Sequence, residues 1–213
     1  MTKGRREGVE PLSCDAGKAE EEGFALAEFL VSTLILLGLS AGLFMMLTDV
    51  QGTSGYQTEV LSVMENTRVA MGVLQRYIVQ TGNNPLSAAY APVTISDATE
   101  VQLCSDLTGS AGGDQGDPDG DIQDANEQIT IRHNPSDRSI EAVDADGTVR
   151  IVARFISGLS FEYLDETGNA TTVGPDVRAI RVTITGSSAV ANPRTGKIFG
   201  LTLNGVSTLP NRG

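Results

Sequence analysis

The chain has 213 residues, of which 40% are hydrophobic and 20% charged, and its 27 Asp and Glu outnumber its 15 Lys and Arg. The net charge of −12 argues against nucleic acid as a direct primary partner, because phosphate contacts require clustered basic side chains. The length suits one membrane or filament helix followed by one globular domain, and the acidity suits an exposed, soluble domain.

The first distinctive segment is an apolar run over residues 24–47, in which Glu28 is the one strongly polar side chain. A helix needs about 20 mostly apolar residues to cross a hydrocarbon core of about 30 Å, so this run is long enough to span a bilayer. An ionisable group at membrane depth is costly and normally marks a function with a specific partner. We therefore expect Glu28 to meet a cation. The alternative is an ordinary polar residue near the lipid interface at the start of a membrane anchor.

The order of features around this run differs from that of a secretory signal peptide. A signal peptide carries its small residues after the apolar stretch, whereas Gly23 precedes it here. Cleavage after Gly23 would leave the apolar segment in the product, with Phe24 as the first residue and Glu28 as the fifth. This arrangement resembles the class III signal of type IV prepilins and pseudopilins. The resemblance implies that a prepilin peptidase cuts after Gly23 and N-methylates Phe24.

The same resemblance implies a partner for Glu28. When subunits stack with their apolar helices parallel, the free amino group of Phe24 in one subunit lies beside Glu28 of a neighbouring pilin or pseudopilin subunit. Removing one member of a buried ion pair strands a desolvated charge, which costs about 3–5 kcal/mol.

Orientation follows from the basic residues before the span, Lys3, Arg5 and Arg6, which should stay cytoplasmic. The resemblance then implies a single-pass protein of the bacterial inner membrane. Its N-terminus is cytoplasmic, its head is periplasmic or extracellular, and it later enters a pilus or pseudopilus.

Beyond the span, the apolar and polar residues of segment 56–80 fall on opposite sides of a helix, which predicts an amphipathic continuation packed on the remainder of the chain. We expect the helix to run from about residue 25 to residue 80, with glycines permitting bending or melting near residues 49–55. The sequence Gly-Asn-Asn-Pro at 82–85 ends it. The apolar positions are Tyr56, Val60, Val63, Met64, Met71, Leu74 and Ile78.

The remainder predicts β-strands joined by turns rich in Asn, Asp and Gly. The expected fold is α+β and pilin-like: a long N-terminal helix packed on an antiparallel sheet. The strands are expected over residues 100–104, 128–133, 139–143, 149–155, 159–164, 177–185 and 198–203. The expected organisation is a leader (1–23), a transmembrane or filament-core helix (24–48), its amphipathic continuation (49–82) and a β-rich exported head (83–213) with an acidic loop (106–127).

The acidic loop has carboxylates at alternate positions, the oxygen ligands that Ca²⁺ prefers. The candidate ligands are Asp117, Asp119, Asp121 and Asp124. An EF-hand is not expected, because Ile122 occupies the position where that loop needs glycine, and the glutamate at its twelfth position is missing. A looser calcium site and a solvated polar loop both remain open.

No enzyme motif is evident, and we expect the chain to be a substrate of the prepilin peptidase and not itself an enzyme. The single histidine, His133, lies at an expected hairpin, which favours a turn or surface role. Cys104 follows an apolar strand pattern and is expected to be buried. Cys14, in the leader, lies across the membrane from Cys104, so no disulfide between them is expected.

The head resembles PilW-type minor pilins and PulJ-type pseudopilins. That resemblance implies a minor pilin that takes part in pilus assembly or in its initiation or tip complex. The first alternative is a PulJ-type pseudopilin of a type II secretion system. The second is a membrane protein that does not polymerise, keeps its N-terminus and binds calcium or another ligand. The segments that carry the resemblance are residues 74–82, 126–131, 156–165, 180–184 and 209–212.

Overall fold

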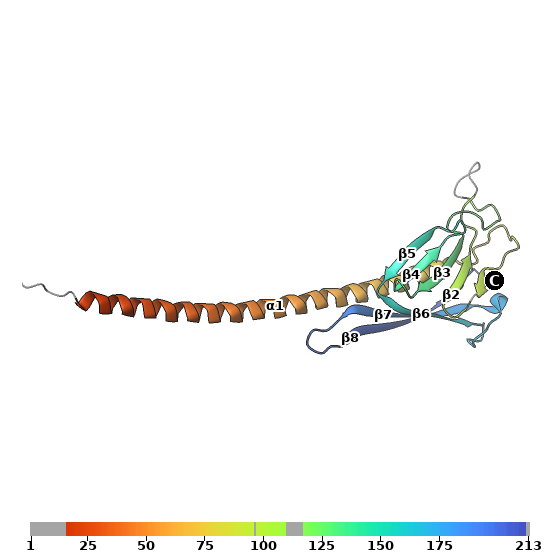
Figure 1. Cartoon of the computed structure of the whole chain (residues 1–213). Coiled ribbons are helices and arrows are strands. Elements are labelled where there is room, and N and C mark those ends of the chain that lie inside the picture. Colours follow the sequence, from red (N-terminus) through yellow and green to blue (C-terminus); the bar gives the residue numbers. More distant parts are fainter. Residues whose placement is uncertain (1–15, 96, 110–116, 212–213) are drawn as a thin grey trace, which may run out of the picture. The chain divides into compact units, whose positions relative to one another are not determined.

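A computed structural model describes residues 16–95, 97–109 and 117–211, with side chains described from residue 26 onward. The chain divides into two compact units, Met1–Gly52 and Thr53–Gly213. The fold is α+β, as expected, with one long N-terminal helix, α1 (Ala16–Gln80), and antiparallel strands (Figure 1). The helix begins earlier than the expected residue 25, because the Ala, Lys and Glu of segment 16–22 are good helix formers.

Residues 26–47 of α1, in the first unit, are apolar on all sides apart from Glu28. The threonines of this part of α1 remain compatible with an apolar environment, because Thr33 Oγ1 donates to the Phe29 carbonyl at 3.0 Å and Thr48 Oγ1 to the Phe44 carbonyl at 3.2 Å. The helix continues through residues 49–55 despite the glycines there. It is long and apolar enough to cross a membrane.

The part of α1 in the second unit buries one face, as its periodicity predicts. Val63, Met71, Leu74 and Ile78 are buried. The pattern missed Thr67, which is also buried because its hydroxyl donates to the Val63 carbonyl at 2.7 Å. The helix ends where expected. Gly82 (φ +80°) turns the chain out of the helix, and its N–H donates to the Cys104 carbonyl at 2.9 Å.

The strands form two antiparallel sheets, so the expectation of a single sheet is wrong (Figure 1). The break comes at Phe155, whose φ of 62° turns the chain between the fifth and sixth strands. The first sheet has the order β1 (Val93–Ile95), β2 (Glu100–Cys104), β3 (Gln128–Asn134), β4 (Ser139–Val143), β5 (Val149–Arg154). The second has the order β6 (Ile156–Leu164), β7 (Ala179–Ala191), β8 (Ile198–Thr208). A short helix, η1 (Gly174–Asp176), precedes β7.

One hydrophobic core joins the second half of α1 to both sheets. In β7 the side chains of Ile180, Val182 and Ile184 are buried while the intervening residues are more exposed, the alternation of a strand with one face on the core. The largest fully buried aliphatic side chains are Leu74, Ile78, Ile129, Ile131, Ile140, Ile156, Ile180 and Ile184.

Two glycines let α1 come close to the second sheet. A Cβ on Gly186 of β7 would lie 2.2 Å from Thr67 Oγ1 and 3.0 Å from Val63 Cγ1. A Cβ on Gly205 of β8 would lie 2.9 Å from Met71 Sδ. At Gly205 the long Met71 side chain can move aside, whereas at Gly186 a side chain would meet the short, branched Thr67 and Val63 and push the helix from the strand, so Gly186 sets the distance between helix and sheet.

Gly186→Ala should therefore lower the free energy of unfolding by about 1–3 kcal/mol through overpacking. Gly200→Ala in neighbouring β8 is the matched control, because its Cβ would meet only the Gly186 carbonyl at 3.9 Å. Adding Thr67→Ala should restore part of the loss, because it removes the hydroxyl that clashes. Chemical denaturation of the full chain in detergent measures all four proteins. Equal stability of the Gly186 and Gly200 variants would contradict the close approach.

Candidate functional site

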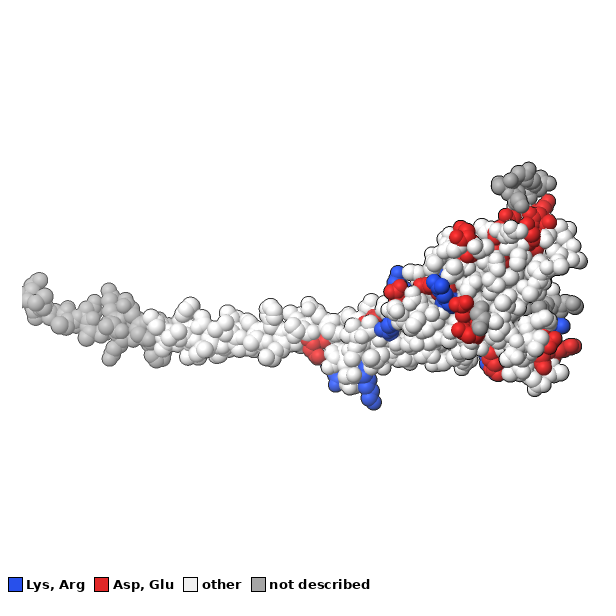
Figure 2. Space-filling view, turned by 45° about the vertical axis from the view of Figure 1, so that its right-hand side comes forward, with Lys and Arg blue, Asp and Glu red and all other residues white. Residues whose placement is uncertain are grey.

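The apolar stretch around Glu28 is exposed all the way round the helix. A helix that is hydrophobic on every side belongs in lipid or inside a bundle of other helices, because water does not tolerate a continuous apolar surface of this size. Figure 2 shows this stretch almost without charge, whereas charged side chains gather farther along the chain. Exposed large side chains in the first unit are Leu26, Phe29, Leu30, Val31, Leu34, Ile35, Leu36, Leu37, Leu39, Leu43, Phe44, Met45, Met46, Leu47 and Val50.

Glu28 is exposed on this apolar stretch. A shallow depression of about 400 Å³ lies on its side of the helix, lined by Ala27, Glu28, Val31 and Ser32. Small residues such as Ala27 and Ser32 allow the backbone of another helix to approach closely. The depression therefore offers a second helix room beside the one carboxylate of the segment.

The predicted processing site, Gly23 and Phe24, lies in the same helix, within the residues whose side chains are not described. Phe24 and Glu28 are four residues apart, which puts them on one helix face a single turn apart. Cleavage after Gly23 and pairing of Glu28 stay predictions.

A second cluster of functional interest lies in the head. It is near the end of α1, where the two ends of the acidic loop come together. We call it the acidic pole: Asp106, Asp119, Asp121, Asp124 and Glu127. Acidic side chains are prominent on the head in Figure 2.

Glu127 is fully buried at the centre of the acidic pole. Its Oε1 accepts the backbone N–H groups of Leu107 and Thr108, each at 2.8 Å, and its Oε2 accepts the N–H of Asp124 at 3.2 Å. One carboxylate therefore holds the two ends of the acidic loop together. The loop itself is described only outside residues 110–116.

Asp106, just after β2, is also fully buried. Its backbone is anchored by Asn83, whose Nδ2 donates to the Asp106 carbonyl at 2.7 Å and whose carbonyl accepts the Asp106 N–H at 2.8 Å. Side-chain Oδ2 of Asp106 accepts the Gly120 N–H at 3.0 Å. Its Oδ1 has no hydrogen-bond partner among the residues that the structure describes.

The structure brings the four predicted calcium ligands only partly together. Asp119 accepts the Asp121 N–H at 3.2 Å, and Asp121 accepts the Gln123 N–H at 2.8 Å, so both carboxylates bind their own loop backbone. Asp124 Oδ2 is buried without a partner. Asp117 is exposed. Across the described ranges, no three His, Cys, Asp or Glu side chains are arranged to hold a metal ion. A calcium site at the four predicted positions thus remains a prediction.

Electrostatics link the members of the acidic pole. Desolvation raises the pKa of Asp124, and the nearby charges of Asp119, Glu127, Asp121 and Asp106 raise it further. Asp106 and Glu127 are not among the predicted site residues, since nothing in the local sequence pattern distinguishes them from other loop acids. Their burial comes from contacts with residues 19–23 positions away.

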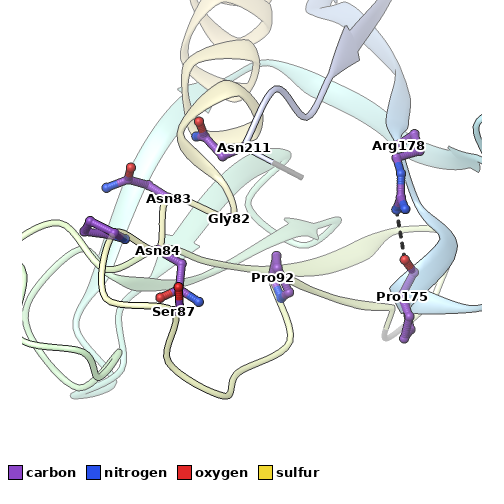
Figure 3. Close-up of a pocket in the computed structure, with 9 residues that line it drawn as sticks. Gly82, Asn83, Asn84, Ser87, Pro92, Pro175, Arg178 and Asn211 are labelled. Atoms are coloured by element: carbon purple, nitrogen blue, oxygen red, sulfur yellow. Dashed lines mark hydrogen bonds between the residues drawn. The ribbon is translucent and has the colours of Figure 1, made fainter. Parts of the chain in front are cut away.

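A polar pocket of about 620 Å³ opens beside the end of α1 (Figure 3). Its one charged lining side chain among the described residues, Arg178, donates from Nη1 to the Pro175 carbonyl at 3.0 Å. Asn83 lines the pocket and also anchors Asp106, so the pocket adjoins the acidic pole. The lining residues are Gly82, Asn83, Asn84, Pro85, Ser87, Pro92, Pro175, Arg178 and Asn211.

Two further predictions concern reactive side chains. Cys104 is buried, as expected, and burial raises the pKa of its thiol to about 11, so the thiol stays protonated at neutral pH. His133 lies in β3 near the turn into β4, and its Nε2 lies 3.2 Å from the Ile156 carbonyl, a structural contact between the two sheets.

Comparison with known proteins adds no relative to this picture. No protein-family model matches the chain, and no curated protein matches it significantly.

Proposed function

We infer that this chain is a minor type IV pilin, similar to the PilW type, that prepilin peptidase processes between Gly23 and Phe24. The observation that carries the proposal is the apolar helical segment 24–47, whose single carboxylate, Glu28, lies one turn after the proposed new N-terminus. The α+β layout, with the same helix continuing into an antiparallel β head, is compatible with it.

The proposed role of the helix follows from its surface. A membrane supplies apolar contacts to an isolated subunit, and neighbouring subunits supply them in a filament. Moving the helix from the membrane into the filament leaves its buried apolar area almost unchanged. Specific contacts therefore determine the axial register between subunits. Residues 26–47 make about 33 Å of helix at 1.5 Å per residue, close to the thickness of a hydrocarbon core.

Glu28 is the proposed specific contact. Its carboxylate would form an ion pair with the amino group of Phe24 from an adjacent subunit. The small residues Ala27 and Ser32 beside Glu28 leave room for that subunit to approach. A paired charge is tolerated at membrane depth, whereas a lone carboxylate is not. The pairing thus favours one axial offset between subunits over all others.

N-terminal processing provides one test of this proposal. Protein purified from membranes of cells that contain a prepilin peptidase should start at N-methylated Phe24, and protein from cells lacking the peptidase should keep residues 1–23. Intact-mass and N-terminal analysis distinguish the two. Gly23→Ala is the matched variant and should block cleavage. An uncut N-terminus in peptidase-containing cells would instead favour a membrane protein that does not polymerise.

Filament assembly provides a separate test. Glu28→Gln keeps the shape of the side chain but removes its charge, so the cleaved variant should enter filaments about tenfold less efficiently or worse. Glu65→Gln makes the same change at an exposed position of α1 and should assemble normally. Immunoblots of sheared filaments and of membranes measure the two pools. Normal incorporation of the cleaved Glu28 variant would exclude a role in register.

A further inference from the structure

We propose that the acidic pole binds a calcium ion between the side chains of Asp106 and Asp124. These carboxylates come from different segments, one just after β2 and one shortly before β3. The proposal concerns the head alone and does not depend on filament formation.

The first argument is the presence of two unused acceptors. Four buried side-chain atoms have no hydrogen-bond partner within the described ranges, namely one each from Thr53, Asp106, Asp124 and Ser139. Both carboxylate oxygens among them belong to the acidic pole. Buried polar groups in folded proteins are nearly always satisfied, so such an oxygen indicates a missing ligand. Asp106 is fully buried, and its other oxygen contacts Gly120 of the acidic loop, so its carboxylate faces the pole.

The second argument is charge. Asp106, Asp124 and Glu127 lie close together, and no Lys or Arg of the described chain pairs with any of them. Among the described residues, the ion pairs of the head involve other acids, at Arg132–Glu141, Arg150–Asp144 and Arg181–Glu162. The Arg150–Asp144 pair lies next to the pole, where Arg150 donates to Asn126 Oδ1 at 2.5 Å and does not bond the acids of the pole. Buried charges are normally paired or bound to a metal.

The donor chemistry selects calcium. All of the donors are oxygens, which favours Ca²⁺ or Mg²⁺ over the metals that prefer nitrogen or sulfur. Ca²⁺ accepts six to eight oxygens in irregular geometry, including backbone carbonyls and water, whereas Mg²⁺ requires a near-ideal octahedron. Two carboxylates from separate loop segments, with carbonyls and water to complete the shell, suit the former. Because so few protein carboxylates converge, we expect a dissociation constant of about 0.1–1 mM, in the range of extracellular calcium modules.

The ion would complement the contact that Glu127 already makes. Glu127 joins the two ends of the acidic loop through backbone N–H groups. Calcium would join them through the side chains of Asp106 and Asp124. Its binding should therefore stabilise the head, because a ligand that binds only the folded state raises the free energy of unfolding.

The experiment is a thermal unfolding series on the full chain in detergent with EGTA, Ca²⁺ or Mg²⁺ at millimolar concentration. We expect Ca²⁺ to raise the melting temperature and Mg²⁺ to have little effect. Asp106→Asn and Asp124→Asn should abolish the shift. Glu166→Gln removes a negative charge from an exposed turn and should retain it.

Terbium luminescence provides a second readout that does not depend on stability. The Asp106 N–H donates to the Tyr90 hydroxyl at 3.3 Å, so Tyr90 is close enough to sensitise Tb³⁺ at this site. The emission should be displaced by Ca²⁺ and absent in folded Asp124→Asn protein. Identical melting of the wild type in EGTA and Ca²⁺, an equal response to Mg²⁺, or emission that persists in both Asp variants would overturn the proposal.

Discussion

The central constraint on this molecule is that one continuous helix must suit two environments: apolar surroundings along its first part and the protein core of the second unit along its later part. Its segment 26–47, apart from Glu28, exposes an apolar surface on every side, and from Val63 onward one face supplies the core of the second unit. The change needs no break in the backbone, because the helix runs uninterrupted through residues 49–55. The change lies in the pattern of side chains alone, from uniformly apolar to amphipathic.

This constraint explains which parts of the fold could be predicted from the sequence. The helix and its buried face follow from periodicity, as Leu74 and Ile78 illustrate, and seven of the strands follow from β-rich runs between turn residues. β1 was missed because Val93–Ile95 is too short to show alternation. β7 and β8 run beyond residues 185 and 203 through Gly- and Ser-rich sequence, because pairing between the two strands outweighs weak intrinsic propensity.

The two-sheet arrangement and the acidic pole could not be predicted from the sequence, because neither has a local sequence pattern. A positive φ at Phe155 separates the sheets, and phenylalanine carries no sequence signal for that conformation. Asp106 is buried because Asn83 fixes its backbone across 23 positions of sequence. Both features depend on long-range contacts. By contrast, the Gly23, Phe24 and Glu28 pattern is local and readable from sequence, and the role we propose for it depends on contacts between subunits.

The shared helix also determines where the second unit can be separated from the apolar segment. Leu74 and Ile78 lie in the same core as strands of both sheets, and Glu59 accepts the backbone N–H groups of Ala189 and Val190 at the end of β7. A soluble fragment must therefore retain the helix from about residue 53. A protease that cut between residues 53 and 80 would remove part of the core and release an unstable β-rich remnant instead of an intact second unit.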